Sequence, residues 1–236
     1  MSLGASLGAG MITAETALAD LRALADPAKA AEMRAYHKAP RDYLGVSVPQ
    51  ITDLATGWRA ELDVPARVAL ADALWQTDIH EARIAAAKLL TQARLRPDEA
   101  AWDLIASWVP TFDAWAIADH ACDAGQRRLV ADPTRIETVE GWTTSPHMWS
   151  RRAALIITLP WAKLNFLKPE DAAIRERVLG WAAAYTQDKD WFIQKAVGWW
   201  LRDLSKHDAD RVRRFLDEHG AAMKGFARSE ATKYLK

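Results

Sequence analysis

The chain has 236 residues, half of them hydrophobic, with 31 basic and 31 acidic side chains. A chain of this length buries a substantial core, as one large domain or as an elongated repeat array. The single Cys122 excludes an intrachain disulfide and a cysteine metal cluster, and the six histidines show no metal-ligand spacing. No apolar run approaches the roughly 18 residues of a membrane span. We therefore expect a cytoplasmic protein without metal or cofactor.

Helix-forming residues dominate the whole chain, and β-branched runs are scarce, so the composition predicts helices throughout. Residues 1–10, MSLGASLGAG, have no charged region and no long apolar stretch, which indicates a flexible leader or cloning remnant and not a signal peptide. Pro and Asp mark most helix starts, as at Asp26-Pro27 and Pro169-Glu170. The predicted helices span residues 13–25, 27–37, 48–60, 64–75, 79–94, 98–108, 112–122, 134–142, 147–158, 169–186, 190–205, 208–219 and 225–235.

Several of these helices resemble one another. EARIAAAKLL, AWAIADHAC, WSRRAALIIT, FIQKAVGWWL and FARSEATKYL share a register that aligns Ile84, Ala118, Arg152, Lys195 and Ser229. The steps between these positions are 34, 34, 43 and 34 residues, a period typical of stacked HEAT-type helix pairs. We therefore expect residues 11–236 to form a single all-α domain, a curved solenoid (α-α superhelix) of HEAT-like repeats with equivalent positions on one concave face.

Four side chains are displaced from the apolar face of their own predicted helix: Trp115, Asp119, Arg152 and Trp199. At about 100° per residue, Trp115 and Asp119 lie roughly 110° to 150° from the centre of their helix's apolar stripe. They are four residues apart and so share a face. Trp199 is in phase with Lys195 and Arg202, whereas its neighbour Trp200 belongs to the core stripe. The core of a soluble protein does not need such a placement, whereas a surface that binds a charged backbone does.

From about Ala31 to its C-terminus the chain resembles the bacterial DNA alkylation repair glycosylases built from HEAT-like repeats. The resemblance rests on AYHKAPRDYLGVSVP, on WAIAD, on the W-x-x-R that ends at Arg152, and above all on FIQKAVGW at 192–199. It implies that Trp115, Asp119, Arg152 and Trp199 line the active-site cleft, and that Tyr36 belongs to the DNA-facing surface. Two departures are Gln50-Ile51-Thr52, where the family has basic residues, and Ala116, where a polar residue is usual.

The resemblance further implies a cofactor-free enzyme that releases N3- or N7-alkylated purines from double-stranded DNA, and we expect a monomer by default. Alkylation makes the base a cationic leaving group, so one fixed carboxylate near C1′ suffices to stabilise the oxocarbenium-like sugar and to position water. Asp119 would supply this carboxylate, and Trp115 and Trp199 would pack against the sugar and favour its positive charge. Flanking phosphates would be held by Arg152, with Arg151, Lys195 and Arg202 as further contacts.

A non-catalytic HEAT-repeat module that binds DNA or a protein is the alternative interpretation, because a fold does not fix a function. Each residue also has a structural role open to it: core packing for a tryptophan, a surface ion pair for Asp119, an interhelix salt bridge for Arg152. A family member that acts on a different DNA structure is a third possibility. Residues 141–236 hold 17 Lys/Arg against 11 Asp/Glu, and residues 1–140 hold 14 against 20. Such asymmetry can mark an interaction face.

Overall fold

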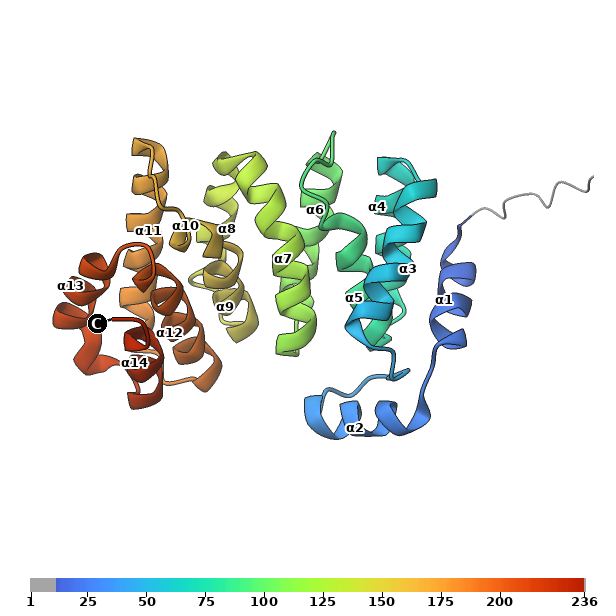
Figure 1. Cartoon of the computed structure of the whole chain (residues 1–236), viewed down its shortest axis with the longest axis horizontal. Coiled ribbons are helices and arrows are strands. Elements are labelled where there is room, and N and C mark those ends of the chain that lie inside the picture. Colours follow the sequence, from blue (N-terminus) through green and yellow to red (C-terminus); the bar gives the residue numbers. More distant parts are fainter. Residues whose placement is uncertain (1–11, 236) are drawn as a thin grey trace, which may run out of the picture. The chain divides into compact units, whose positions relative to one another are not determined.

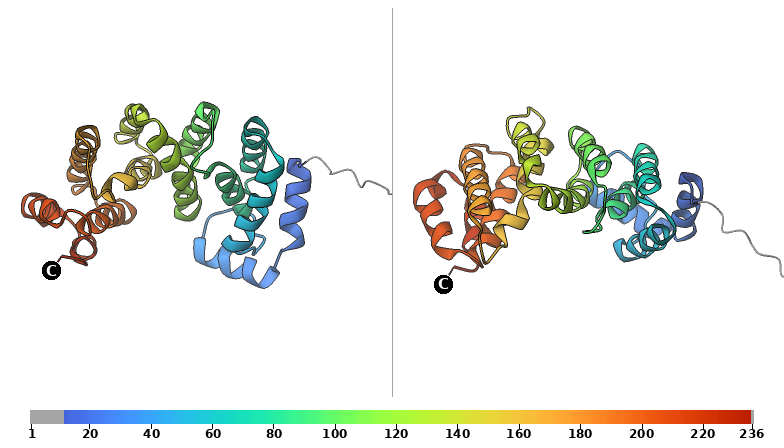
Figure 2. Two further views of the ribbon diagram at one scale, coloured as in Figure 1. Left: turned by 45° about the horizontal axis from the view of Figure 1, so that its top comes forward. Right: turned by 90° about the horizontal axis from the view of Figure 1, so that it is seen from above.

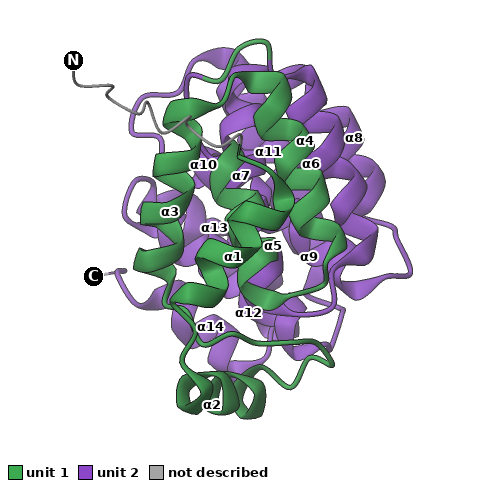
Figure 3. Cartoon of the chain, turned by 90° about the vertical axis from the view of Figure 1, so that its right-hand side faces the viewer, with its two compact units in different colours: residues 1–90, 95–97 green, residues 91–94, 98–236 purple. Residues whose placement is uncertain are grey.

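The computed structural model describes residues 12–235, which form fourteen α-helices, three short 3-10 helices and no β-strand (Figure 1). The predicted all-α fold is therefore confirmed, while the predicted leader at residues 1–10 lies outside the described residues. None of the described helices is long and apolar enough to cross a membrane. The chain divides into two compact units (Figure 3), and the prediction of a single domain remains a prediction.

The first unit contains the chain up to Leu90 together with Leu95–Pro97. Its centre is α5, most of whose residues are buried, and α3 and α4 pack against that helix. The buried Glu81 of α5 accepts hydrogen bonds from the backbone N–H groups of Leu44 and Gly45 at 2.9 and 2.8 Å, which fixes the loop after α2. The helices of this unit are α1 (Ala14–Ala23), α2 (Pro27–His37), α3 (Val48–Glu61), α4 (Val64–Gln76) and α5 (His80–Leu90).

The second unit contains Thr91–Arg94 and the chain from Asp98 onward. Within it, α7, α9, α12 and α14 lie side by side in one layer, and α6, α8, α11 and α13 form a second layer against them (Figure 2). These are the stacked helix pairs that the repeat period predicts. The helices are α6 (Glu99–Trp108), α7 (Trp115–Ala131), α8 (Ile136–Trp142), α9 (Met148–Ile157), α10 (Leu159–Ala162), α11 (Pro169–Tyr185), α12 (Trp191–Ser205), α13 (Ala209–His219) and α14 (Gly225–Thr232).

Two helix ends differ most from the prediction. The helix predicted at 112–122 is α7, which continues to Ala131, because Gly125 serves close packing and does not end the helix. A Cβ on Gly125 would lie 2.4 Å from Cδ1 of Ile157 in α9. The helix predicted at 79–94 is α5, which stops at Leu90. Nη2 of the buried Arg128 of α7 donates hydrogen bonds to the carbonyl oxygens of Gln92 and Ala93 at 2.6 and 3.1 Å, so these carbonyl groups do not continue the helix.

The orientation of α12 follows from its core face. Ile193, Val197, Trp200, Leu201 and Leu204 are all completely buried, as their helical phase predicts. Gly198 lets α12 approach α14 closely, since a Cβ there would lie 2.8 Å from a backbone oxygen of that helix. With this face buried, the residues in phase with Trp199 must point the other way.

Candidate functional site

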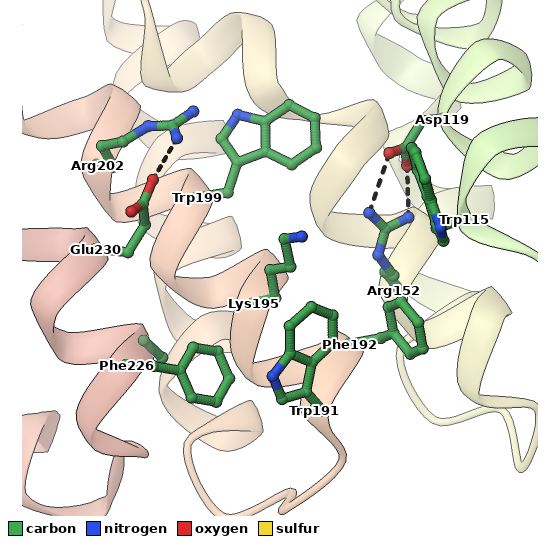
Figure 4. Close-up of a pocket in the computed structure, with 11 residues that line it drawn as sticks. Trp115, Asp119, Arg152, Trp191, Phe192, Lys195, Trp199, Arg202, Phe226 and Glu230 are labelled. Atoms are coloured by element: carbon green, nitrogen blue, oxygen red, sulfur yellow. Dashed lines mark hydrogen bonds and ion pairs between the residues drawn. The ribbon is translucent and has the colours of Figure 1, made fainter. Parts of the chain in front are cut away.

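The second unit contains a pocket of about 520 Å³ between α7, α9, α12 and α14. Figure 4 shows its side chains, with the Asp119–Arg152 ion pair on one side and the aromatic and basic residues of α12 facing it. The pocket brings together residues that are far apart in the sequence. Its lining residues are Trp115, Asp119, Arg152, Trp191, Phe192, Lys195, Trp199, Arg202, Phe226, Ala227 and Glu230.

Asp119 and Arg152 form a two-pronged ion pair between α7 and α9. Nη1 of Arg152 donates to Oδ1 of Asp119 at 2.5 Å, and Nη2 donates to Oδ2 at 3.2 Å. The Arg152 side chain is 3% exposed, whereas that of Asp119 is 23% exposed. The carboxylate is thus held in a fixed orientation by the better-buried partner and still reaches the pocket. The sequence places Arg152 at the flank of its apolar stripe, but the structure buries its guanidinium against the neighbouring helix.

Two tryptophans form walls of the same pocket. Trp115 starts α7 and Trp199 lies in the middle of α12, and both are partly exposed. The indole Nε1 of Trp199 donates to Oδ2 of Asp203 at 3.2 Å, and Asp203 is itself buried. This bond restricts the rotation of the Trp199 ring. Trp200, in contrast, is completely buried, as its helical phase predicts.

The predicted phosphate contacts have different surroundings. Lys195 is exposed, lies 4.7 Å above the ring of Trp191, and has no carboxylate partner among residues 12–235. Arg202 lines the pocket but is paired with Glu230 and with Asp203.

The last two predicted contacts lie outside the pocket lining. Arg151 is paired with Asp188 at 2.9 Å. Tyr36 belongs to the first unit, where its side chain is 70% exposed.

Sequence reasoning missed the aromatic floor of the pocket. Trp191 and Phe226 stack with their ring centroids 5.6 Å apart, and Phe192 meets Trp191 edge-on at 5.0 Å. Trp191 precedes Lys195 by four residues and Trp199 by eight, so the helical phase could have included it. Phe226 comes from α14, and only the packing of α14 on α12 brings it to the site.

The described residues contain no group of three His, Cys, Asp or Glu side chains placed to hold a metal ion. Cys122 lies on α7, is buried and does not line the pocket. Burial, with a smaller effect of the Asp119 charge, raises the pKa of its thiol well above the usual range. A cysteine kept as the neutral thiol is a poor nucleophile and fills space in the core.

Comparison with known proteins relates the chain to a family. Residues 17–235 match the family model described as DNA alkylation repair enzyme. No curated protein sequence matches the chain.

Several solved structures share the fold. A predicted DNA alkylation repair enzyme from Enterococcus faecalis is 23% identical, with a TM-score of 0.75, over 89% of this chain and 96% of that one. AlkD2 from Streptococcus mutans is 19% identical, with a TM-score of 0.61, over 81% and 91%. Pseudomonas fluorescens alkylpurine DNA glycosylase AlkC, bound to DNA with an abasic site analog, is 16% identical, with a TM-score of 0.55, over 93% of this chain and 61% of that chain.

Proposed function

The chain belongs to the DNA alkylation repair enzyme family, and from this premise we propose that it is a DNA glycosylase that hydrolyses the N-glycosidic bond of N3- and N7-alkylated purines in duplex DNA. The observation that carries the proposal is the Asp119 carboxylate, oriented by Arg152 and open to a pocket with tryptophan walls. A purely structural ion pair would not need to face such a pocket.

In this proposal Asp119 acts on the sugar and not on the base. Because the alkylated purine is already cationic, it departs without a strong acid to protonate it. Positive charge then develops on the deoxyribose, and the adjacent carboxylate stabilises that charge and orients the attacking water. At about 4 Å and with an effective dielectric constant of about 20, one such pair of charges interacts by about 4 kcal/mol. The partial neutralisation of Asp119 by Arg152 lowers this figure.

Trp115 and Trp199 would enclose the sugar, since indole faces attract a cation and tolerate C–H groups. Lys195 is the strongest candidate for a flanking phosphate, because it is exposed and without a carboxylate partner among the described residues. Arg202 would join it if its pair with Glu230 opens, and Arg151 and Tyr36 would contact DNA beyond the pocket. A phosphate contact by Arg152 would compete with its bonds to Asp119. The DNA-bound state of the AlkC structure, which shares the fold, supports DNA as the partner.

The test is single-turnover release of 7-methylguanine and of 3-methyladenine from a defined duplex by wild type and Asp119→Asn. We expect release to fall by up to about a thousandfold, because about 4 kcal/mol is the upper limit of the lost stabilisation, while DNA binding is kept. Asp123→Asn is the matched control, because Asp123 lies one turn further along α7 and does not line the pocket. Excision by Asp119→Asn at the wild-type rate would exclude the mechanism. No release by wild type would favour the non-catalytic binding module.

The amide of Asp119→Asn leaves the buried guanidinium of Arg152 without its charge partner, and this can unfold the site. The double variant Asp119→Asn/Arg152→Met removes both charges and so avoids that problem. Loss of excision in a double variant that unfolds at the wild-type temperature would assign the loss to chemistry.

A further inference from the structure

The loop between α10 and α11, residues 163–168, carries the most exposed large hydrophobic side chain of the described residues. Phe166 is 93% exposed, and no other such side chain exceeds the 70% of Tyr36. Single exposed hydrophobic residues are common on protein surfaces, so exposure alone does not indicate a partner. What distinguishes Phe166 is the support that its loop receives from the rest of the fold.

Two side chains outside the loop hold the residues just before Phe166. The buried Arg175 of α11 donates hydrogen bonds to the backbone oxygens of Trp161 at 2.9 Å and of Leu164 at 2.7 Å. Nδ1 of His207, which follows α12, and Oδ1 of Asn165 form a hydrogen bond of 2.6 Å. Because the loop is already fixed, a contact made by the ring of Phe166 costs little further ordering of the chain.

The start of the loop adjoins the candidate site. Nζ of Lys163 lies 3.5 Å from Oδ2 of Asp203, the same oxygen that accepts the hydrogen bond from Nε1 of Trp199. One carboxylate therefore connects the loop to a wall of the pocket. A long molecule that extends from Trp199 along α12 would meet the loop next.

The end of α12 beside the loop is basic. Lys206 is exposed, has no ion-pair partner among the described residues, and places its Nζ 4.4 Å from the centre of the Tyr234 ring. Nζ of Lys233 lies 5.8 Å from the centre of the same ring. Lys168 in the loop is exposed and likewise without an ion-pair partner in the described part of the chain. Cations interleaved with exposed aromatic rings are typical of surfaces that bind nucleic acids.

We propose that Phe166 is a wedge that inserts between two stacked base pairs of duplex DNA near the alkylated nucleotide, while Lys206 holds a phosphate of the adjoining backbone. The inference rests on the proposed function, which supplies DNA as the occupant of the neighbouring pocket. An apolar side chain inserted at a base step partly unstacks it and kinks the duplex. The contacts that the bent duplex makes with the protein offset the cost of unstacking.

The first experiment measures the affinity of Phe166→Ala for an undamaged duplex between about 50 and 200 mM salt. We expect at least about fivefold weaker binding, as for the loss of one stacking contact, and an unchanged slope of log K against log salt, because no charge is removed. Phe166→Tyr keeps the ring and should bind like wild type. Val130→Ala is the matched control, since Val130 is a half-exposed hydrophobic residue of α7 outside the pocket lining. Binding by Phe166→Ala within about twofold of wild type would overturn the inference.

The second experiment detects unstacking directly. A duplex with one abasic site analogue fixes the register, and 2-aminopurine is placed at successive positions beside that site. Its fluorescence should rise on binding of wild type at one base step and not on binding of Phe166→Ala. The absence of such a step for wild type would exclude a wedge. Because Phe166 is almost fully exposed, its replacement should leave the unfolding temperature unchanged, so misfolding does not confuse either result.

Lys206→Ala tests the phosphate contact separately. It should lower the salt slope by about 0.9, in contrast to Phe166→Ala, and an unchanged slope would overturn this part of the proposal. The outcomes also distinguish the wedge from the glycosylase. Excision by wild type together with unaltered binding by Phe166→Ala removes only the wedge. Weakened binding of undamaged duplex by Phe166→Ala, without any excision by wild type, removes only the glycosylase.

Discussion

Replacement of Arg152 by methionine tests how the site is built. Methionine fills much of the same space but removes both hydrogen bonds to Asp119. Loss of one partner from a buried ion pair costs about 3–5 kcal/mol. Two features place Arg152→Met at or just below the lower end of that range. The Asp119 side chain is 23% exposed, so water partly hydrates the remaining carboxylate. Nε of Arg152 is buried without a hydrogen-bond partner among the described residues, so the change also removes an unsatisfied donor.

We therefore expect Arg152→Met to lower the free energy of unfolding by about 2–3 kcal/mol, measured by urea denaturation. Arg151→Met is the matched control. Arg151 is the adjacent residue, and its pair with Asp188 is 21% and 25% exposed, so its loss should cost about 0–1 kcal/mol. Equal effects of the two substitutions would refute the reasoning, because the larger loss is expected from the burial of the Arg152 guanidinium.

Excision and binding by the same variant separate the two roles of Arg152. A guanidinium that only orients Asp119 affects the rate of bond cleavage, so Arg152→Met should excise more slowly and bind plain duplex with unchanged affinity. A guanidinium that leaves Asp119 to hold a phosphate contributes to binding as well, and its loss should lower affinity and salt slope together.

Three further predictions concern the surroundings of the site and the first unit. Gly198→Ala should lower the free energy of unfolding by about 1–3 kcal/mol, because the new Cβ would lie 2.8 Å from a backbone oxygen of α14. Gly180→Ala in α11 is the control, since its Cβ meets nothing within 4 Å and should raise the free energy of unfolding by about 0.5–1 kcal/mol. Denaturation curves of both variants check this. Asp203→Ala should slow excision roughly fivefold without weakening duplex binding, because Trp199 loses a hydrogen bond worth about 1 kcal/mol, and single-turnover rates beside binding isotherms check this. Burial lowers the pKa of His37 in the folded chain. The contribution of neutral His37 to stability should therefore be fully present above about pH 6.5 and decline as the pH falls below that value. Unfolding temperatures measured against pH should lose this decline in His37→Gln.

The sequence predicts the helices well because each helix carries its own periodic pattern and its own start signal. The side chain of Asp26 accepts from the first free N–H groups of α2, and Asp190 does the same for α12. The ends are harder to predict, since they depend on packing between helices. Glycine is a residue that commonly ends a helix. Only the position of Ile157 across the interface shows that Gly125 is a contact point between helices.

The residues of the site also differ in how far the sequence predicts them, depending on whether one helix or the packing of two helices decides their position. Trp115, Asp119, Lys195 and Trp199 can be found from helical phase, because displacement from a core stripe is a property of one helix. The pairing of Asp119 with Arg152 depends on how α7 and α9 pack, and the sequence does not contain that geometry in any local pattern. This limit matters for the proposed mechanism. A helical phase places a cation near a surface, whereas the structure shows which carboxylate that cation already holds. An arginine whose two Nη atoms are engaged by Asp119 differs chemically from the exposed Lys195, which has no carboxylate partner among the described residues. The phosphate contacts of such a protein are therefore best sought among the cations that its own acids leave unneutralised.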